Sequence, residues 1–243
     1  MITRVEKASG PLVSCVMATA RRPAFLKQAI RYFLRQTYEP KELIIVDDEE
    51  RTETNTAEII PDDPRISYSW VKPMPLGAKL NHGIAQAKGF VIQKLDDDDW
   101  YHPWFLSTMV ATMAPKGFSN VMGSTSTFLV FMKETGELKH AGHTWFIGGS
   151  LAFSKDVWSK KPFEEIMSGE DDRFIKDHGT ARKVATVDPE LYMVVRHGQG
   201  HAWVTERGKD VDQFFGARPL YGKPLEAFMA ADEVAFYRNL ARR

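Results

Sequence analysis

The sequence lacks the features that mark several broad classes of protein. Its 243 residues include a single cysteine, Cys15, so no disulfide can form within the chain, and a reducing compartment fits. The 32 basic and 32 acidic residues cancel, so no broad basic surface for nucleic acid is predicted. No apolar stretch reaches the roughly 18 residues that would predict a membrane-spanning helix. What remains is the composition of a soluble globular protein, with 43% hydrophobic residues.

The first hundred residues alternate short apolar runs with amphipathic segments. The apolar runs predict four buried strands, at 12–18, 42–48, 65–71 and 90–95. Helical spacing predicts one helix from Pro23 to Leu34 and another from Leu76 that Gly89 ends, with a short helix at 54–60. This alternation predicts an α/β fold, with a mainly parallel sheet covered by helices.

The pattern changes after a predicted helix that runs from Pro103 to about Met113. Residues 120–154 are rich in β-branched and aromatic side chains, which predicts a smaller set of antiparallel or mixed strands. A short helix with an acidic start is predicted at 169–179, and one or two strands at 183–203. The tail from Pro224 has apolar residues near helical spacing, and we expect it to pack back on the body.

Polar side chains follow three of the predicted strands, in the stretches ATARR, VDDEE and LDDDDW. Because ligands bind beyond the carboxyl ends of parallel strands, these three loops are predicted to meet in one crevice. The third loop holds four consecutive carboxylates, Asp96 to Asp99. Neighbouring like charges ~5 Å apart repel by roughly 3 kcal/mol, so a cation should compensate or water should surround them. Carboxylates suit Mg²⁺ or Mn²⁺, and the alternative is a solvated acidic turn before a helix.

Three further groups are candidates, each with a plainer alternative. Asp47 and Asp48 can accept hydrogen bonds from a ribose or a base, or can form a turn. The cluster from Glu170 to Asp172 offers a carboxylate base, or a helix cap. His197 and His201 lie in a glycine-rich loop and can complete a metal shell, although a lone histidine is more often structural.

Ordered blocks of residues 11 to 200 resemble the family 2 glycosyltransferases, which have the GT-A fold. The opening block is VSCVMATARRPAFLKQAIRYFLRQTYEPKELIIVDD. The next is LGAKLNHGIAQAKGFVIQKLDDDDW, which resembles the segment that leads to the Asp-x-Asp motif of the family. The third, GEDDRF, resembles the motif that carries the catalytic base. The resemblance implies a single GT-A domain over 1–243, with a nucleotide-binding half at about 11–115, an acceptor-binding half at 116–205 and a helical tail at 206–243.

The resemblance also implies how the donor is held. Residues expected to bind the nucleotide-sugar are Thr19, Ala20, Arg21, Asp47, Lys79, Asp96 and Asp97. It implies Mn²⁺ or Mg²⁺ on Asp98, with His197 closing over the diphosphate or His201 in its place. The frame of Asp96 and Asp98 is the first choice for the Asp-x-Asp motif, and that of Asp97 and Asp99 is the alternative.

Catalysis is implied at Asp171, the expected base, with Glu170 beside it orienting the acceptor. Trp145 is expected to stack on an acceptor sugar or to pack in the core, and Gly149, with Gly148, allows close backbone approach. The implied function is single-sugar transfer with inversion from a nucleotide-diphospho-sugar, a UDP-sugar first. The implied acceptor is a hydroxyl of a glycan or glycoconjugate.

Departures from the family pattern shape this expectation. The usual Pro-Thr-Tyr-Asn-Arg loop is Ala-Thr-Ala-Arg-Arg at 18–22, which adds donors for phosphate, and the Gln-x-x-Arg-Trp motif of processive synthases is missing.

Transfer of a nucleotidyl group to a sugar phosphate is the less favoured alternative, because MATARRP lacks glycine. A non-catalytic nucleotide- or sugar-binding module is another. The expected location is cytoplasmic, with peripheral contact at the inner membrane face left open by arginines in the tail. The sequence does not predict an oligomeric state.

Overall fold

The structure is a computed structural model, and it describes residues 4–49, 56–142, 146–197 and 222–239. The strands are β1 (Val13–Thr19), β2 (Lys41–Asp47), β3 (Ile66–Trp70), β4 (Val91–Lys94), β5 (Trp100–Tyr101), β6 (Val121–Thr125), β7 (Thr127–Met132), β8 (Glu137–Gly142), β9 (Ala152–Ser154), β10 (Arg182–Thr186) and β11 (Tyr192–Arg196). The α-helices are α1 (Pro23–Leu34), α2 (Leu76–Gln86), α3 (Phe105–Met113), α4 (Lys155–Lys160), α5 (Glu170–Asp177) and α7 (Ala231–Asn239). Short 3₁₀ turns are η1 (Thr56–Ile59), η2 (Ala114–Lys116), η3 (Gly148–Ser150), η4 (Pro189–Leu191) and η5 (Leu225–Ala227).

The main sheet confirms the predicted α/β architecture. Within the described ranges its seven strands have the order β10-β6-β9-β4-β1-β2-β3. Strand β9 runs antiparallel to both β4 and β6, and the other pairings are parallel. In register, Val13 of β1 lies opposite Lys41 of β2 and Val91 of β4. The carboxyl ends of β1, β2, β4 and β6 therefore share one edge of the sheet.

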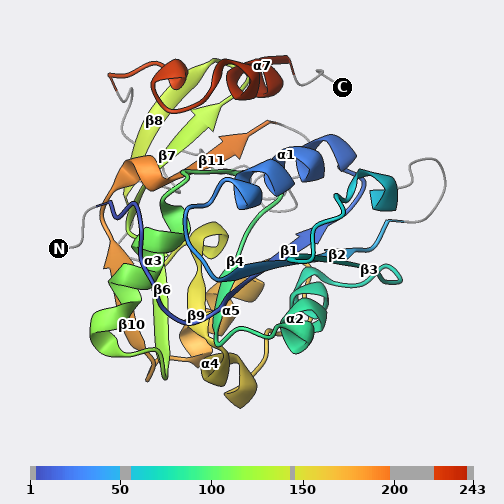
Figure 1. The fold of residues 1–243 in the computed structure, drawn as a ribbon, viewed down its shortest axis with the longest axis vertical. Helices are drawn as coiled ribbons and strands as arrows, with labels where there is room; N and C mark the ends of the chain where they lie inside the picture. Colours follow the sequence, from blue (N-terminus) through green and yellow to red (C-terminus); the bar gives the residue numbers. More distant parts are fainter. Residues whose placement is uncertain (1–3, 50–55, 143–145, 198–221, 240–243) are drawn as a thin grey trace.

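Helices cover both faces of this sheet because its central strands are apolar on both sides. Cys15 and Met17 of β1 belong to the core beneath α1 and α3, whereas Val16 faces α2, α4 and α5. Figure 1 shows α1 and α2 on opposite sides of the sheet. The first-half helices were predicted from their spacing, and α1 begins at Pro23 as expected.

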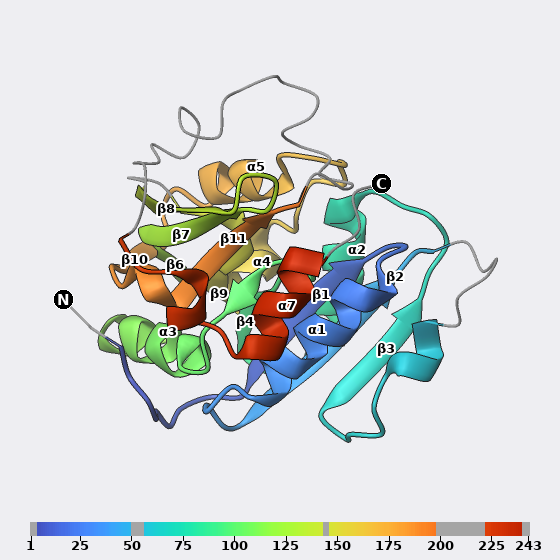
Figure 2. The ribbon, with the colours of Figure 1, turned by 90° about the horizontal axis from the view of Figure 1, so that it is seen from above.

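A second sheet, with the order β5-β11-β7-β8, is also buried on both faces. One face of it packs on the main core through Phe128 and Tyr192. The other face, with Leu129 and Met193, packs under α7 and against α1. Figure 2 shows α7 lying beside α1, so the prediction that the tail packs back on the body is confirmed. None of the helices in the described ranges is long and apolar enough to cross a bilayer.

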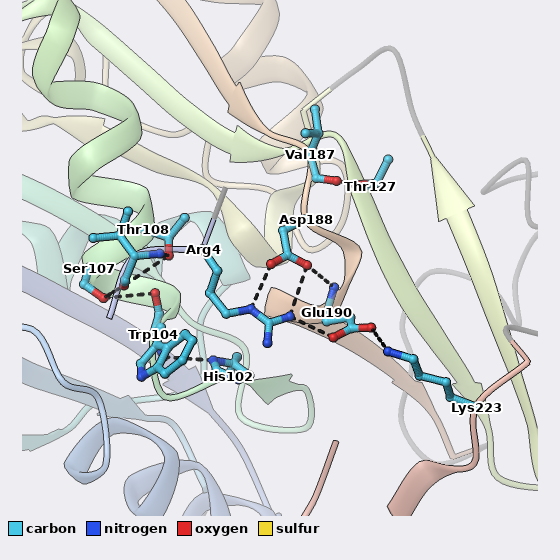
Figure 3. Close-up of polar contacts among 11 residues, drawn as sticks. Arg4, His102, Trp104, Ser107, Thr108, Thr127, Val187, Asp188, Glu190 and Lys223 are labelled. Carbon is cyan, nitrogen blue, oxygen red and sulfur yellow. Dashed lines mark hydrogen bonds and ion pairs between the residues drawn. The ribbon is translucent and has the colours of Figure 1, made fainter. Parts of the chain in front are cut away.

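The chain before β1 is fastened to the body by a charged cluster (Figure 3). Arg4 Nε donates to Asp188 Oδ2 at 2.9 Å, and Arg4 Nη2 donates to Glu190 Oε2 at 2.8 Å. Lys223 Nζ donates to the other oxygen of Glu190 at 2.7 Å. This network joins segments from the two ends of the sequence beside η4. Each acid is paired within the cluster, so the cluster is structural.

One predicted boundary was wrong. Gly89 does not end α2, because the helix stops at Gln86 and Ala87 is already extended. Gly89 instead permits close contact with β1, since a Cβ there would lie 2.4 Å from the carbonyl oxygen of Leu12. The predicted short helix at 54–60 is the 3₁₀ turn η1, although residues 54 and 55 lie outside the described ranges.

Candidate functional site

The three loops that were predicted to converge do so at the carboxyl edge of the main sheet. Thr19, at the end of β1, donates from Oγ1 to Asp97 Oδ2 at 2.6 Å. Lys79 of α2 donates from Nζ to Asp48 Oδ1 at 2.8 Å and to the carbonyl oxygen of Thr19 at 3.3 Å. The ends of β1, β2 and β4 are thus joined by side-chain hydrogen bonds.

The four aspartates alternate between the protein interior and the crevice side. The side chain of Asp96 is 34% exposed and that of Asp98 is 12% exposed, whereas that of Asp97 is 1% exposed. Asp99 is also buried, and its oxygens accept from the hydroxyl of Tyr192 and from the backbone N–H of Val195. Asp97 and Asp99 therefore fix the loop, and Asp96 and Asp98 are the more accessible pair.

Two cations face the run, as the repulsion argument required. Arg22 pairs with Asp97 Oδ1 at 2.6 Å and with Asp98 Oδ2 at 2.7 Å. Lys94 pairs with Asp96 Oδ1 at 2.5 Å. Raised pKa values reduce the remaining negative charge. Burial raises the pKa of Asp97 to about 7, although the charge of Arg22 lowers it. Burial and the neighbouring acids also raise the pKa of Asp99 well above its usual range.

His197 lies at the end of β11, and the structure brings it to Asp98. Its Nε2 atom is 3.1 Å from Asp98 Oδ2, and the ring is buried. The ring of Phe25 in α1 lies against it, with the centroids 4.4 Å apart. An imidazole and a carboxylate from elements 99 residues apart in sequence therefore meet at the crevice.

The turn η3 carries two glycines that contact both groups of acids. A Cβ on Gly148 would lie 1.6 Å from Asp171 Oδ2, so the Asp171 carboxylate occupies the space that any other residue would fill. A Cβ on Gly149 would lie 2.0 Å from the Tyr192 hydroxyl and 2.8 Å from Asp96 Oδ2. The candidate base and the acidic run thus lie against neighbouring residues of one turn.

Glu170 and Asp171 open helix α5, directly after Gly169, whose φ of 80° is in the left-handed region that favours glycine. Burial and the adjacent Asp171 raise the pKa of Glu170 to about 7. Burial also raises the pKa of Asp171, while Lys94 opposes the rise. A carboxylate whose pKa is raised binds a proton more readily, which suits a general base.

The other expected donor-site residues have mixed surroundings. Asp47 is buried, and its two oxygens accept from the Tyr68 hydroxyl at 2.9 Å and the Glu49 N–H at 3.0 Å. Arg21 is exposed, with a left-handed φ of 55°, next to the half-buried Ala20. Arg22, rather than Arg21, contacts the acidic run. The expected roles of Trp145 and His201 concern residues outside the described ranges.

Sequence reasoning gave no role to Lys94, Tyr101 or Tyr192. The Tyr101 hydroxyl accepts from the backbone N–H of Asp96 at 2.8 Å and donates to the carbonyl oxygen of Gly149 at 2.7 Å. It therefore ties the acidic run to η3. One signal in the sequence could have indicated the role of Lys94. It lies two residues before Asp96, and side chains two residues apart in an extended chain point to the same side.

The donor atoms at Asp98 and His197 suit a divalent cation such as Mn²⁺ or Mg²⁺. In the part of the chain that the structure describes, no group of three or more histidine, cysteine, aspartate or glutamate side chains has the geometry of a complete metal site. Two protein ligands fit a site that is completed by phosphate oxygens of a substrate and by water, as is usual for Mg²⁺. The residues present are compatible with the metal that the resemblance implies.

The comparisons with known proteins establish the family and the fold of the chain. The model of the glycosyl transferase family 2 matches residues 14–173, so the chain belongs to that family. It is 33% identical over 119 residues to the GalNAc(5)-diNAcBac-PP-undecaprenol beta-1,3-glucosyltransferase of Campylobacter jejuni. The aligned region covers 47% of this chain and 38% of that protein. The chain therefore spans well under two thirds of that relative.

Solved structures show the GT-A fold. The mannosyltransferase PcManGT from Pyrobaculum calidifontis, in complex with GDP-Man and Mn²⁺, superposes with a TM-score of 0.62 at 14% identity, covering 81% of this chain and 60% of that one. Residues 1–349 of S. aureus TarS, in complex with UDP-GlcNAc, give a TM-score of 0.59 at 16% identity, covering 78% and 60%. The structural similarity confirms the predicted fold and the family match confirms the predicted family, and neither favours the alternative functions.

Proposed function

We propose that this chain transfers a single sugar from a nucleotide-diphospho-sugar to a hydroxyl of a glycan or glycoconjugate, with inversion at the anomeric carbon. The observation that carries the proposal is the contact of η3 with both acid groups: Gly148 against Asp171 and Gly149 against Asp96. A base and a donor-side carboxylate held by adjacent residues suit displacement at one carbon. Family membership and the nucleotide-sugar complexes of the similar structures support the donor class.

The donor would lie along the carboxyl edge of the sheet. Residues proposed to hold it are Thr19, Ala20, Arg21, Asp47, Lys79 and Asp96, whereas Asp97, expected to join them, is 1% exposed and fixes the loop from within. The greater exposure of Asp96 and Asp98 favours this pair as the Asp-x-Asp frame. Among donors, a UDP-sugar is the first to test, and a GDP-sugar is the second because PcManGT was solved with GDP-Man.

Asp98 and His197 would hold Mn²⁺ or Mg²⁺. When bound, the metal would supply Lewis-acid stabilisation of the charge that grows on the diphosphate. Arg22, which contacts Asp97 and Asp98, adds a fixed positive charge at the same place. We propose this metal dependence from the donor atoms of these side chains.

The chemical step needs a base on the acceptor side. The acceptor hydroxyl oxygen forms a bond to the anomeric carbon while the bond from that carbon to the diphosphate oxygen breaks. Asp171 takes the hydroxyl proton, and the nucleoside diphosphate leaves with the bonding electron pair. Glu170, which is buried beside Asp171, holds the acceptor or shares the proton. Trp145 is proposed to stack on the sugar, whereas the space beside Gly149, which was expected to admit the acceptor, is filled by the Tyr192 hydroxyl.

The test is a panel of UDP- and GDP-sugars with Mn²⁺, sugar acceptors and two matched variants. Asp171→Asn should lose transfer by at least about 10³-fold while nucleotide binding stays within about twofold. Asp172→Asn, an exposed neighbour in the same helix, should keep transfer. Release of nucleoside diphosphate with an inverted product, read by NMR, supports the proposal. Pyrophosphate release from UTP would favour nucleotidyl transfer instead, and binding without turnover would favour a non-catalytic module.

The wider setting of the reaction stays a prediction. We propose that the chain is a single domain with a nucleotide-binding half and an acceptor-binding half. The two halves share one core, because strands of the second half complete the main sheet. A cytoplasmic location with peripheral membrane contact is likewise proposed, and fractionation of cells expressing the chain would test it.

A further inference from the structure

Lys94 is a buried cation for which the reaction outlined above has no assigned role. It is the last residue of β4, and it is 5% exposed. Its backbone N–H donates to the carbonyl oxygen of Leu151 at 2.9 Å, which holds this residue within the sheet. Burying an ammonium group is costly unless partners compensate, so its surroundings should explain why it is there.

Its surroundings are the acids on both sides of the proposed reaction. Lys94 Nζ donates to Asp96 Oδ1 at 2.5 Å on the donor side. On the acceptor side, the charges of Glu170 and Asp171 also act on it. Burial would lower the pKa of Lys94, but these three carboxylates raise it above its ordinary value, so it stays protonated. The geometry agrees, because Lys94 bonds to Leu151, the residue after η3, and η3 lies against Asp96 through Gly149 and against Asp171 through Gly148.

Within the described ranges, charged groups from three segments act on the Glu170–Asp171 pair. From its own helix, Asp172 acts on Asp171, and Asp171 acts on Glu170. From the loop after β4, Asp96 adds further negative charge. From β4 comes Lys94, and η3 contributes the uncharged Gly148. Among these side chains, Lys94 is the cation that favours the ionised form of the pair, beside the backbone N–H of Asp172, which donates to Asp171 Oδ1 at 2.8 Å.

We propose that Lys94 is a positioning residue for the transfer reaction, which fixes Asp96 on the donor side and stabilises the ionised Glu170–Asp171 pair on the acceptor side. This inference rests on the proposed function for its kinetic consequence. Its electrostatic part does not, because the ionisation of the pair can be measured without turnover.

The direction of the effect follows from the charges. A nearby opposite charge favours the ionised form of a carboxyl group and lowers its pKa. Removal of Lys94 should therefore raise the pKa values of the pair, which burial has already raised. At neutral pH a smaller fraction would be ionised and able to accept a proton. The acidic limb of the kcat profile should move to higher pH by about one unit, with a loss of kcat of up to about tenfold on that limb which alkaline pH restores.

The experiment compares Lys94→Met, Lys94→Gln and Lys94→Arg with a matched control. The control is Lys41→Met, which removes another buried lysine from the same sheet. Lys41 begins β2, at the opposite end of the strands, and it donates to the carbonyl oxygen of Gln36 at 2.8 Å. Both losses should reduce stability, so stability alone does not distinguish them. Only the Lys94 variants should change the titration of the acid pair.

Two readouts are taken on each folded variant. The first is a ¹³C carboxyl titration of Glu170 and Asp171 by NMR, and the second is kcat and KM across about pH 5.5 to 9.5. Expected are higher apparent pKa values and a shifted kcat profile in Lys94→Met and Lys94→Gln, with rescue in Lys94→Arg and none of this in Lys41→Met. Unchanged pair titration in both neutral variants would overturn the inference. If the unaltered chain transfers no sugar while the titration still shifts, the proposed function fails and the electrostatic role of Lys94 stands.

Discussion

Replacing Gly148 by alanine tests the site through a single carbon atom. The new Cβ would lie 1.6 Å from Asp171 Oδ2 and 3.0 Å from Asp171 Cβ. Carbon–oxygen contacts are rarely shorter than about 3.3 Å, so the carboxylate would have to move by about 1.7 Å, or η3 would have to shift. Asp171 has a short side chain whose own Cβ is also near, so a small rotation does not relieve the clash.

A displacement of this size should be expensive for catalysis. Misplacing a reacting group by about 1 Å can lower a rate by about 100-fold, or about 2.7 kcal/mol. We therefore expect Gly148→Ala to lose at least about 100-fold in kcat, and overpacking to cost about 1–3 kcal/mol of unfolding free energy. Nucleotide affinity should change little, because the clash is with Asp171 and not with the donor loops.

The assay is kcat with the best donor of the panel, beside thermal unfolding and nucleotide titration. Gly142→Ala is the control, because a Cβ there would meet Thr127 Cγ2 at an ordinary 3.7 Å. That control should keep activity within about twofold. A folded Gly148→Ala protein with unaltered kcat would refute the reasoning, since Asp171 would then not be acting where the structure places it.

Two further predictions concern the metal and the tail. With Mn²⁺ present, a nucleoside diphosphate should raise the melting temperature, and EDTA should abolish that rise. Asp98→Asn should lower the apparent affinity measured from this rise by about tenfold. Glu233→Ala should cost about 1–3 kcal/mol in urea unfolding, because Arg35 would lose its buried partner. Breaking the exposed pair of Arg31 and Asp232 by Arg31→Ala should cost less than about 1 kcal/mol. Equal costs for the two pairs would contradict the burial argument.

The main sheet could be predicted from the sequence because strand and helix periods are local signals. The run from Leu12 to Ala18 is short and rich in β-formers, which favours a buried strand, and Pro23 marks the helix that follows. Convergence of the three polar loops then follows from parallel topology. The end of α2 was misplaced because Gly89 had two possible reasons to be glycine, and the contact with Leu12 is not visible from its neighbours in sequence.

The site was predicted less completely, because its decisive contacts join distant residues. The acidic run was recognisable, but the choice of which aspartates turn inward depends on Tyr192 and Val195, almost a hundred residues away. Gly148 and Gly149 were expected to allow close approach to an acceptor. The structure shows instead that Asp171 and Tyr192 fill the space beside them. No local pattern in the sequence encodes such a contact.

The four adjacent aspartates can coexist because they do not share one task. Asp99 accepts the backbone N–H of Val195 at 3.0 Å, and Val195 lies two residues before His197. This bond sets the position of β11 at its carboxyl end, and so it helps to bring the imidazole within 3.1 Å of Asp98. The inward-facing carboxylate thus places the partner of an outward-facing one. An acidic turn whose only role was to be solvated would not bury Asp97 and Asp99 at the cost of raised pKa values, so the burial itself argues for a constructed site.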